Sequence, residues 1–198
     1  MLVSIIKKTV SLGEIVDHVY NRIMISFKKV RYSSYPQIVG KLRMQNDGQI
    51  FFGKSVRFNS RLTSNFVGLN KPCTIAVTNK GRLQIDDFSG FSGVSIYCAS
   101  AIWIGKYVNC GGNVSIWDTD FHPLNFEDRR VNDVSKIRSM PIIIEDDVFI
   151  GANSIILKGV VIGARSVIGA GSVVTKTIPP DEIWAGNPAK FIRRLNNL

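Results

Sequence analysis

The stretch from Trp117 to Pro123 contains a histidine that could do acid–base chemistry. His122 follows two carboxylates, Asp118 and Asp120, by four and two positions. An imidazole that a carboxylate orients is the usual general base near neutral pH. From the residues alone two interpretations stay open, a catalytic base and a solvated loop histidine. The other histidine of the chain, His18, falls in a predicted helix, where we expect a surface or packing role.

The cysteines do not supply a second reactive group. Cys73, Cys98 and Cys110 have neither the even number of a disulfide framework nor metal-ligand spacing, and no cysteine lies near His122. They fit a reducing compartment and are expected to be buried small hydrophobic residues. The sequence therefore predicts no metal site and no covalent nucleophile.

A repeat of six residues predicts the fold that positions this stretch. Large aliphatic residues recur at every sixth position from Ile144 to Val174, namely at Ile144, Ile150, Ile156, Ile162, Ile168 and Val174. Because six is even, these side chains point to the same side of an extended chain. Short extended pieces at this spacing predict a parallel β-helix of hexapeptide repeats, in which stacked coils bury a continuous core. A β-sandwich gives no reason for a strict period of six.

Two earlier sets of the repeat are out of phase with each other. Ile85, Phe91 and Tyr97 form one set, and Ile104, Cys110 and Ile116 form another that is shifted by one residue. The shift predicts a corner with one extra residue near position 100. The repeat then breaks between Ile116 and Ile144, which predicts a loop (117–143) thrown out of the coil wall with His122 in it.

We predict three parts: a helical appendage (1–37), a β-helix domain (38–187) and a basic tail (188–198) of one or two helical turns. Ser11 and Glu14 have the spacing of a capping box, and apolar residues at helical spacing follow, which predicts a helix over about 12–28. Its apolar stripe is expected to pack on the solenoid or cap its first coil; lying on a membrane is the alternative. Residues 1–10 place an apolar run before Lys7 and Lys8, the reverse of a secretory signal, so none is expected.

The net charge of +10 is concentrated near the N-terminus. Residues 1–43 contain eight basic and two acidic residues, a net charge of +6. A solvated basic face, a phosphorylated ligand and an anionic membrane surface all fit such a region. Nucleic acid is not predicted, because no zinc-finger, recognition-helix or aromatic–basic signature is present. No apolar run approaches the ~20 residues that span a bilayer.

The chain also resembles a known family. The hexads, the HPL sequence at 122–124, GAGSVVTK at 169–176 and AGNPAK at 185–190 occur in the order seen in the hexapeptide-repeat O-acetyltransferases. The maltose, galactoside and capsule- or lipopolysaccharide-modifying acetyltransferases are the most similar branches, over roughly 85–195. The resemblance implies an all-β, left-handed parallel β-helix, a homotrimer with active sites between subunits, and acetyl-coenzyme A (acetyl-CoA) as donor. It also implies that His122 is the catalytic base.

The resemblance assigns roles to further residues. Asp120, or else Asp118, is expected to orient His122 or bind the acceptor, with Asp120 favoured, while Trp117 is expected either to stack on a sugar or to pack at the rim. Ser92 is the nearest match to the family's acceptor-contacting asparagine. The remaining matches concern coenzyme A: Ala152, Ala170, Thr175 and Lys176 for the pantetheine arm, and Lys190 and Arg193 for the nucleotide phosphate.

These observations together predict an acetyl-CoA-dependent O-acetyltransferase that acts on a sugar hydroxyl, or on a lipid-linked or oligosaccharide acceptor, in bacterial surface-polysaccharide synthesis. Its expected location is the cytoplasm, with peripheral contact to the inner membrane as an open possibility. N-acetylation of an amino sugar and a non-catalytic scaffold remain alternatives. A solenoid carbonic anhydrase is excluded, because it needs three zinc-binding histidines and the chain has two.

Overall fold

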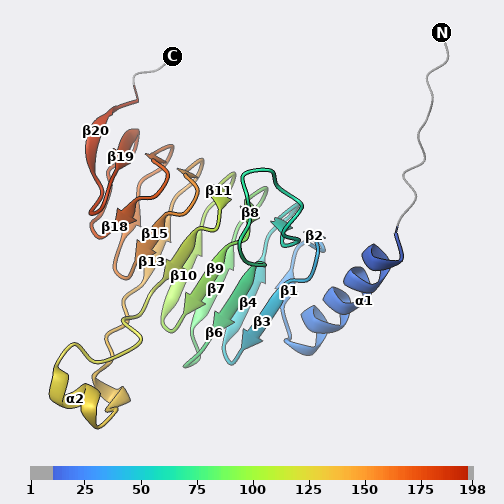
Figure 1. The fold of residues 1–198 in the computed structure, drawn as a ribbon, viewed down its shortest axis with the longest axis horizontal. Helices are drawn as coiled ribbons and strands as arrows, with labels where there is room; N and C mark the ends of the chain where they lie inside the picture. The colour runs from blue at the N-terminus through green and yellow to red at the C-terminus, as the bar shows by residue number, and fades with distance from the viewer. Residues whose placement is uncertain (1–10, 196–198) are drawn as a thin grey trace.

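The computed structural model describes residues 11–195, and the expectation about a signal sequence in residues 1–10 lies outside them. The chain winds into a coil with three flat sides, and equivalent strands of successive turns stack into three sheets (Figure 1). All pairings between coils are parallel. The predicted left-handed parallel β-helix is confirmed.

Each side of the coil is one sheet. Sheet A contains β1 (Arg31–Tyr32), β4 (Gln49–Phe52), β7 (Arg82–Ile85), β10 (Ala101–Ile104), β13 (Ile142–Ile144) and β16 (Val161–Ile162). Sheet B contains β2 (Gln37–Val39), β5 (Arg57–Asn59), β8 (Gly90–Ser92), β11 (Asn109–Gly112), β14 (Phe149–Ile150), β17 (Val167–Ile168), β19 (Glu182–Ala185) and β20 (Lys190–Arg194). Sheet C contains β3 (Arg43–Asn46), β6 (Thr74–Val77), β9 (Ser95–Cys98), β12 (Ser115–Trp117), β15 (Ile155–Leu157) and β18 (Val173–Val174).

The repeat residues form ladders inside the coil. Ile144, Ile150 and Ile156 are at most 1% exposed, and each lies in register with its equivalent one turn later. In the first turns Phe52, Phe58 and Phe91 fill the same interior, with successive ring centroids 5.3 Å apart. The three cysteines are also buried and unpaired, as predicted.

The corner from sheet A to sheet B repeats one backbone conformation. One residue per turn has a φ between 55° and 64°, and its amide donates to the preceding turn; these residues are Ser55, Phe88, Tyr107, Asp147, Arg165 and Asp181. A positive φ is uncommon for bulky residues. The two aromatic members, Phe88 and Tyr107, stack with centroids 5.0 Å apart.

The predicted phase shift has two sources in the structure, a β-bulge in β11 and a longer corner near position 100. Ile96 and Cys98, not Tyr97, are the buried residues of β9, and Tyr97 faces outward from sheet C. Cys110 pairs with Phe91 whereas Gly112 pairs with Ser92, so the extra residue is Gly111, in a β-bulge of β11. The predicted corner near position 100 is also longer than in the regular turns: Ile104 follows Ile96 by eight positions, whereas the equivalent residue Ile162 follows Ile156 by six, so this corner has two extra residues and not one.

The N-terminal helix, α1 (Leu12–Phe27), has the predicted capping box between Ser11 and Glu14. Its predicted packing was wrong for most of the apolar stripe: the buried helix residues are Asn21 and Ile25, and Met24 packs beside them, while the rest of the stripe faces solvent. The Asn21 side chain donates to the Gly40 carbonyl (2.8 Å) and accepts from the Leu42 amide (2.9 Å). The end of the coil needs polar partners for its backbone, and this requirement overrides the apolar pattern.

Both predicted domain boundaries move. The solenoid starts at β1, within the predicted appendage, so residues 31–37 belong to the coil. At the other end, the predicted helical turn of the tail is a strand: β20 pairs antiparallel with β19, and together they extend sheet B. Backbone groups of the last coil are paired in this way.

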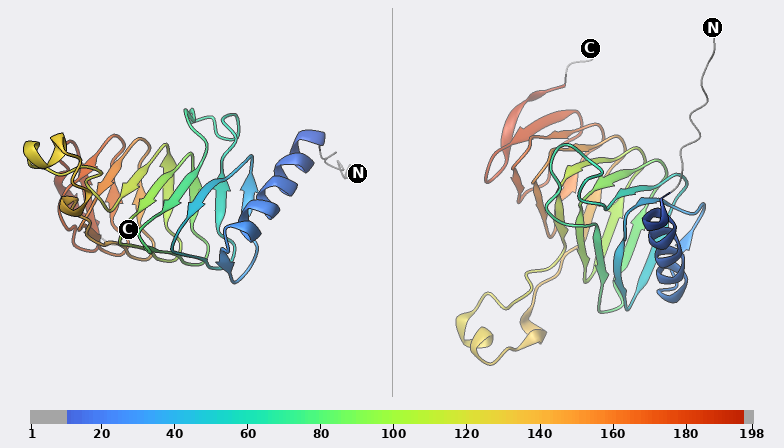
Figure 2. Two further views of the ribbon diagram at one scale, coloured as in Figure 1. Left: turned by 90° about the horizontal axis from the view of Figure 1, so that it is seen from below. Right: turned by 45° about the vertical axis from the view of Figure 1, so that its right-hand side comes forward.

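Two segments leave the wall at opposite ends of sheet C (Figure 2). Residues 60–73 leave at the corner from sheet B to sheet C and were not predicted. Residues 118–141 leave at the corner from sheet C to sheet A, as predicted, and carry the short helix α2 (Phe126–Arg130) and the 3-10 helix η1 (Val134–Lys136). Within residues 11–195, no helix is both long enough and apolar enough to cross a membrane.

Replacing Asn21 by alanine should loosen α1 without disturbing the distant coils. The change leaves two buried backbone groups without partners, at about 1–3 kcal/mol each. Because each coil contacts mainly its neighbours, the effect should stay local. Hydrogen exchange should show α1 amides exchanging at least ~10-fold faster, with β13–β18 unchanged and with no effect of Ser26→Ala, an exposed control. Equal acceleration throughout the chain would contradict this local role.

Candidate active site

The 118–141 loop has a closed neck. The Asp120 amide donates to the Arg138 carbonyl (3.0 Å), and the Met140 amide donates to the Asp118 carbonyl (2.9 Å). Between these bonds, Thr119 and Ser139 form a bridge, and their hydroxyls lie 2.9 Å apart. The two chain segments therefore leave the wall as a short antiparallel pair, which fixes the base of the loop.

A strained residue directs the chain at this neck. Phe121 has a φ of 62°, and its ring contacts Tyr97 and Trp117 edge-on at 4.8 and 5.6 Å between centroids. Such a backbone costs on the order of 1–3 kcal/mol, which ring packing can offset. His122 follows immediately and is exposed, with no hydrogen-bond partner among residues 11–195. The histidine is therefore presented to solvent on an anchored turn.

Asp120 is held by a cation from the next coil. Its carboxylate forms an ion pair with the Lys158 ammonium group, and both side chains are largely buried. Its second oxygen, Oδ2, is buried and has no hydrogen-bond partner in the described part of the chain. No hydrogen bond joins Asp120 to His122, so the orienting role stays a prediction. A role for Lys158 was not predicted from the sequence. The pairing of Leu157 with Trp117 could have indicated one, because it places Lys158 next to the start of the loop.

Asp118 is part of the wall. It is fully buried, and its carboxylate accepts from the amides of Ala99 (2.6 Å) and Ser100 (2.8 Å). Burial raises the pKa of this carboxyl in spite of those bonds. The predicted contact with an acceptor was therefore wrong for Asp118, because the sequence cannot show that the neighbouring turn needs its oxygens.

Ser92 and Trp117, which were predicted to contact the acceptor, are engaged with neighbouring side chains. Ser92 is 6% exposed, and its hydroxyl accepts from the side-chain amides of Asn59 and Asn65. It lies at the end of sheet C opposite to His122, beneath the 60–73 segment, so this chain does not bring the two together. Trp117 is half-buried against Phe121, which fits the rim-packing alternative.

A pocket of about 430 Å³ lies beside the loop neck. Its lining combines hydroxyls, an amide and two aromatic rings, from Thr78, Asn79, Tyr97, Thr119, Phe121 and Ser135 among others. The Thr78 hydroxyl is buried without a hydrogen-bond partner among residues 11–195. Rings and hydroxyls of this kind suit a polar ring such as a sugar.

The predicted pantetheine residues lie at both ends of the last strands of sheet C. Ala152 and Ala170 occupy equivalent corners of successive coils, and a Cβ on Gly151 would approach the Ala170 nitrogen to 2.4 Å. The stacking itself therefore requires glycine at position 151, whereas the Ala170 side chain is exposed. Thr175 and Lys176 follow β18 at the other end, on the side of the His122 loop. A ligand touching all four would run along the outer face of sheet C.

The predicted phosphate residues, Lys190 and Arg193, are both exposed on β20. Neither is paired with a carboxylate in the described chain; the neighbouring Arg194 contacts Glu182 at 3.6 Å. Both cations are thus open to an anionic ligand, and the predicted contact stays a prediction.

Other reactive groups are unsuitable. Within the described residues, no three His, Cys, Asp or Glu side chains could hold a metal ion. Burial raises the pKa of all three cysteines, that of Cys73 to about 11, so their thiols stay protonated near neutral pH.

Asp118→Ala should destabilise the coil strongly. Two buried amides would lose their acceptor, which costs about 2–5 kcal/mol and should lower Tm by roughly 5–15 °C. The matched control is Asp146→Ala, which removes a similar bond to the Lys106 amide in an exposed corner and should cost under ~1 kcal/mol. Thermal unfolding measures both variants, and equal Tm shifts would refute the special role of Asp118.

About half of the chain is similar in sequence to known acetyltransferases. Residues 141–176 match the family described as hexapeptide repeat of succinyl-transferase. Galactoside O-acetyltransferase of Escherichia coli is 43% identical over 96 residues, which cover 48% of this chain and 45% of that protein. The chain therefore spans less than half the length of this curated relative.

Solved structures extend the similarity to most of the chain. A hexapeptide-repeat acetyltransferase from Vibrio cholerae, complexed with acetyl-CoA, is 26% identical, with 94% of this chain and 80% of that chain covered and a TM-score of 0.55. An N-acyltransferase from Bacillus cereus, in complex with dTDP and 3-hydroxybutyryl-CoA, is 22% identical over 87% of this chain and 88% of that chain, with a TM-score of 0.64, and shows a shared fold. The predicted resemblance is confirmed: the chain carries the hexapeptide-repeat solenoid of the hexapeptide-repeat acetyltransferases.

Proposed function

We propose that the protein transfers the acetyl group of acetyl-CoA to a sugar hydroxyl, with His122 as general base. The observation that carries the proposal is the exposed His122 on a closed-neck loop. That loop emerges directly before the segment that matches hexapeptide repeats. Similarity to an acetyltransferase complexed with acetyl-CoA supports the co-substrate.

In the proposed reaction, an imidazole nitrogen of His122 takes the proton of the acceptor hydroxyl as its oxygen attacks the thioester carbonyl. A backbone amide or a small polar side chain stabilises the tetrahedral oxyanion. The carbon–sulfur bond then breaks, and the departing thiolate takes the proton from the imidazolium. The enzyme is regenerated without a covalent intermediate, which agrees with the buried, protonated cysteines.

We assign the co-substrate to the outer face of sheet C. The pantetheine arm would pass Ala152 and Ala170 and reach Thr175 and Lys176. Lys190 and Arg193 are the candidates for the nucleotide phosphate. Lys190 offers the phosphate a point charge, whereas an arginine there could form two parallel hydrogen bonds. The phosphate contact therefore depends more on Arg193.

The acceptor that we favour is a sugar hydroxyl in bacterial surface-polysaccharide synthesis. The 43% identity to galactoside O-acetyltransferase supports a sugar acceptor and O-acetylation. The pocket beside the neck offers rings and hydroxyls for such a ligand. The N-acyltransferase shares the fold at 22% identity, and this does not favour N-acetylation.

We further propose a homotrimer with active sites between subunits. Exposed apolar side chains on the outer faces of sheets A and B, such as Trp103, Ile143 and Phe149, suit contacts between subunits. The place of action that we propose is the cytoplasm, where acetyl-CoA is available, at the surface of the inner membrane.

His122→Ala should lower kcat by ~10²–10⁴-fold, the usual contribution of a general base. Coenzyme A binding and oligomer mass should be unchanged, because the His122 ring has no partner in the described structure. His18→Ala, which removes the other histidine of the chain, is the control and should keep full activity on a soluble sugar. A His122→Ala enzyme that kept more than about half of the rate would exclude His122 as the base.

Ala170→Trp should raise the KM for acetyl-CoA at least ~10-fold with little change in the KM for the acceptor, because the indole would fill the proposed path of the arm. Ala164→Trp is the matched control: it has the equivalent hexad position one corner earlier, after Ile162 and Gly163. Steady-state kinetics separates the two constants. An equal rise in both, or the same effect of Ala164→Trp, would reject this path.

A further inference from the structure

We propose that α1 binds an anionic membrane surface through the face that it turns away from the solenoid. The inference deepens the location proposed above; it rests on that proposal for the place of action and not for the acetyl-transfer chemistry. Helix α1 lies at the end of the molecule (Figure 1), and most of its apolar side chains are exposed.

The two faces of α1 are opposite in character. At about 100° per residue, one arc of roughly 120° contains the apolar side chains, which are 49–77% exposed: Leu12, Ile15, Val16, Val19, Ile23 and Phe27. The arc that contacts the first coil is polar by comparison and includes Glu14, Asp17 and Asn21. The helix is thus docked by hydrogen bonds, an ion pair and the buried Ile25 with Met24 beside it, while the six side chains of the apolar arc stay exposed.

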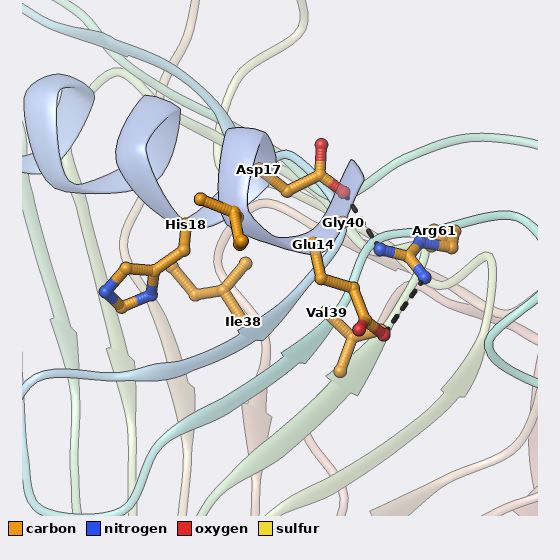
Figure 3. Close-up of a pocket in the computed structure, with 8 residues that line it drawn as sticks. Glu14, Asp17, His18, Ile38, Val39, Gly40 and Arg61 are labelled. Atoms are coloured by element: carbon orange, nitrogen blue, oxygen red, sulfur yellow. Dashed lines mark hydrogen bonds and ion pairs between the residues drawn. The ribbon is translucent and has the colours of Figure 1, made fainter. Parts of the chain in front are cut away.

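The exposed arc of α1 contains no carboxylate. Both acidic residues of α1 turn toward the coil, where Arg61 contacts Asp17 at 3.0 Å and Glu14 at 3.5 Å (Figure 3). The pocket between α1 and the coil lies on this inner side and is lined by the same three residues. A bilayer that approached the apolar arc would not meet these carboxylates first.

Positive charge, in contrast, flanks the exposed arc. Arg22 lies on one side of the helix stripe, and Lys41 lies over the Tyr20 ring on the other side, 5.5 Å from its centroid. Lys29 and Arg31 are exposed just beyond the helix end. An apolar arc bordered by cations is the pattern of a helix that lies in the interface of an anionic bilayer.

The charges favour a lipid surface over a second copy of this chain. Two copies joined through their apolar arcs would bring the same cations together, which is unfavourable. Anionic lipid headgroups would instead neutralise them. With 16 residues, α1 is about 24 Å long and would lie along the surface, since it is not suited to cross it.

The test is co-sedimentation of the full-length protein with vesicles of phosphatidylglycerol and phosphatidylcholine, against vesicles of phosphatidylcholine alone. Wild type should bind the anionic vesicles at low salt and should release them at 0.5 M salt, where the Debye length is short. A variant with glutamine in place of Arg22, Lys29 and Arg31 should bind the anionic vesicles ~100-fold more weakly. Val19→Ser with Ile23→Ser should bind at least ~10-fold more weakly at every salt concentration.

A matched charge control is Lys54, Lys80 and Lys106 changed to glutamine, three exposed cations on the coil wall. This control should bind vesicles like wild type. Unchanged binding by the α1 variants, or no salt-sensitive binding by wild type, would overturn the proposal. So would light scattering that showed wild type assembling through α1 into larger oligomers that the Val19/Ile23 variant lacks.

Acetyl transfer to a soluble sugar, measured on the same variants, separates this inference from the proposed function. The α1 variants should keep wild-type kcat and KM on that substrate. Vesicle binding in an inactive protein would contradict the acetyltransferase proposal alone, and full activity without vesicle binding would contradict the membrane contact alone.

Discussion

The parallel stacking of one coil on the next is the constraint on which this structure depends. Neighbouring strands lie about 4.8 Å apart, so equivalent corners of successive turns come into direct contact. A Cβ on Gly163 would approach the Pro180 nitrogen to 2.3 Å, and one on Gly151 would approach the Ala170 nitrogen to 2.4 Å. Small corner residues and inward aliphatic side chains are both consequences of this spacing.

The same constraint decides where chemistry can be placed. The inward positions of the wall are filled by the core and the corners by contacts between turns, which leaves little room for a cluster of reactive side chains within the coil. Extra residues must therefore leave the wall at a corner, as residues 118–141 do, and the polar groups at the neck must then be satisfied locally. Asp118 bonds the turn at Ala99 and Ser100, and Lys158 of the next coil pairs with Asp120. The exposed His122 depends on this polar base and on the Phe121 ring beneath it.

Features that repeat were predictable from the sequence. The period of six gives the β-helix, its break gives the 118–141 loop, and Ser11 with Glu14 gives the start of α1. Features that depend on one contact between distant segments were not. The apolar stripe of α1 suggests inward packing, but Asn21 satisfies Gly40 and Leu42 at the coil end instead. Similarly, the buried role of Asp118 and the pairing of β20 with β19 involve partners that no local pattern specifies. Among the candidate site residues, His122 is recognisable by its type and context, while the place of Lys158 beside Asp120 follows only from the register of β12 with β15.

The number of turns between the His122 loop and the C-terminal strand fixes the distance between them. Two turns, β13–β15 and β16–β18, separate the loop from β19 and from the cations of β20. Each turn adds about 4.8 Å along the stack, so the span between the histidine and those cations is set by counting turns and not by loop flexibility. A chain with one turn more in this region would keep the same corners, core and neck, yet the ligand that we propose to bind between these two points would have to be longer by that single increment.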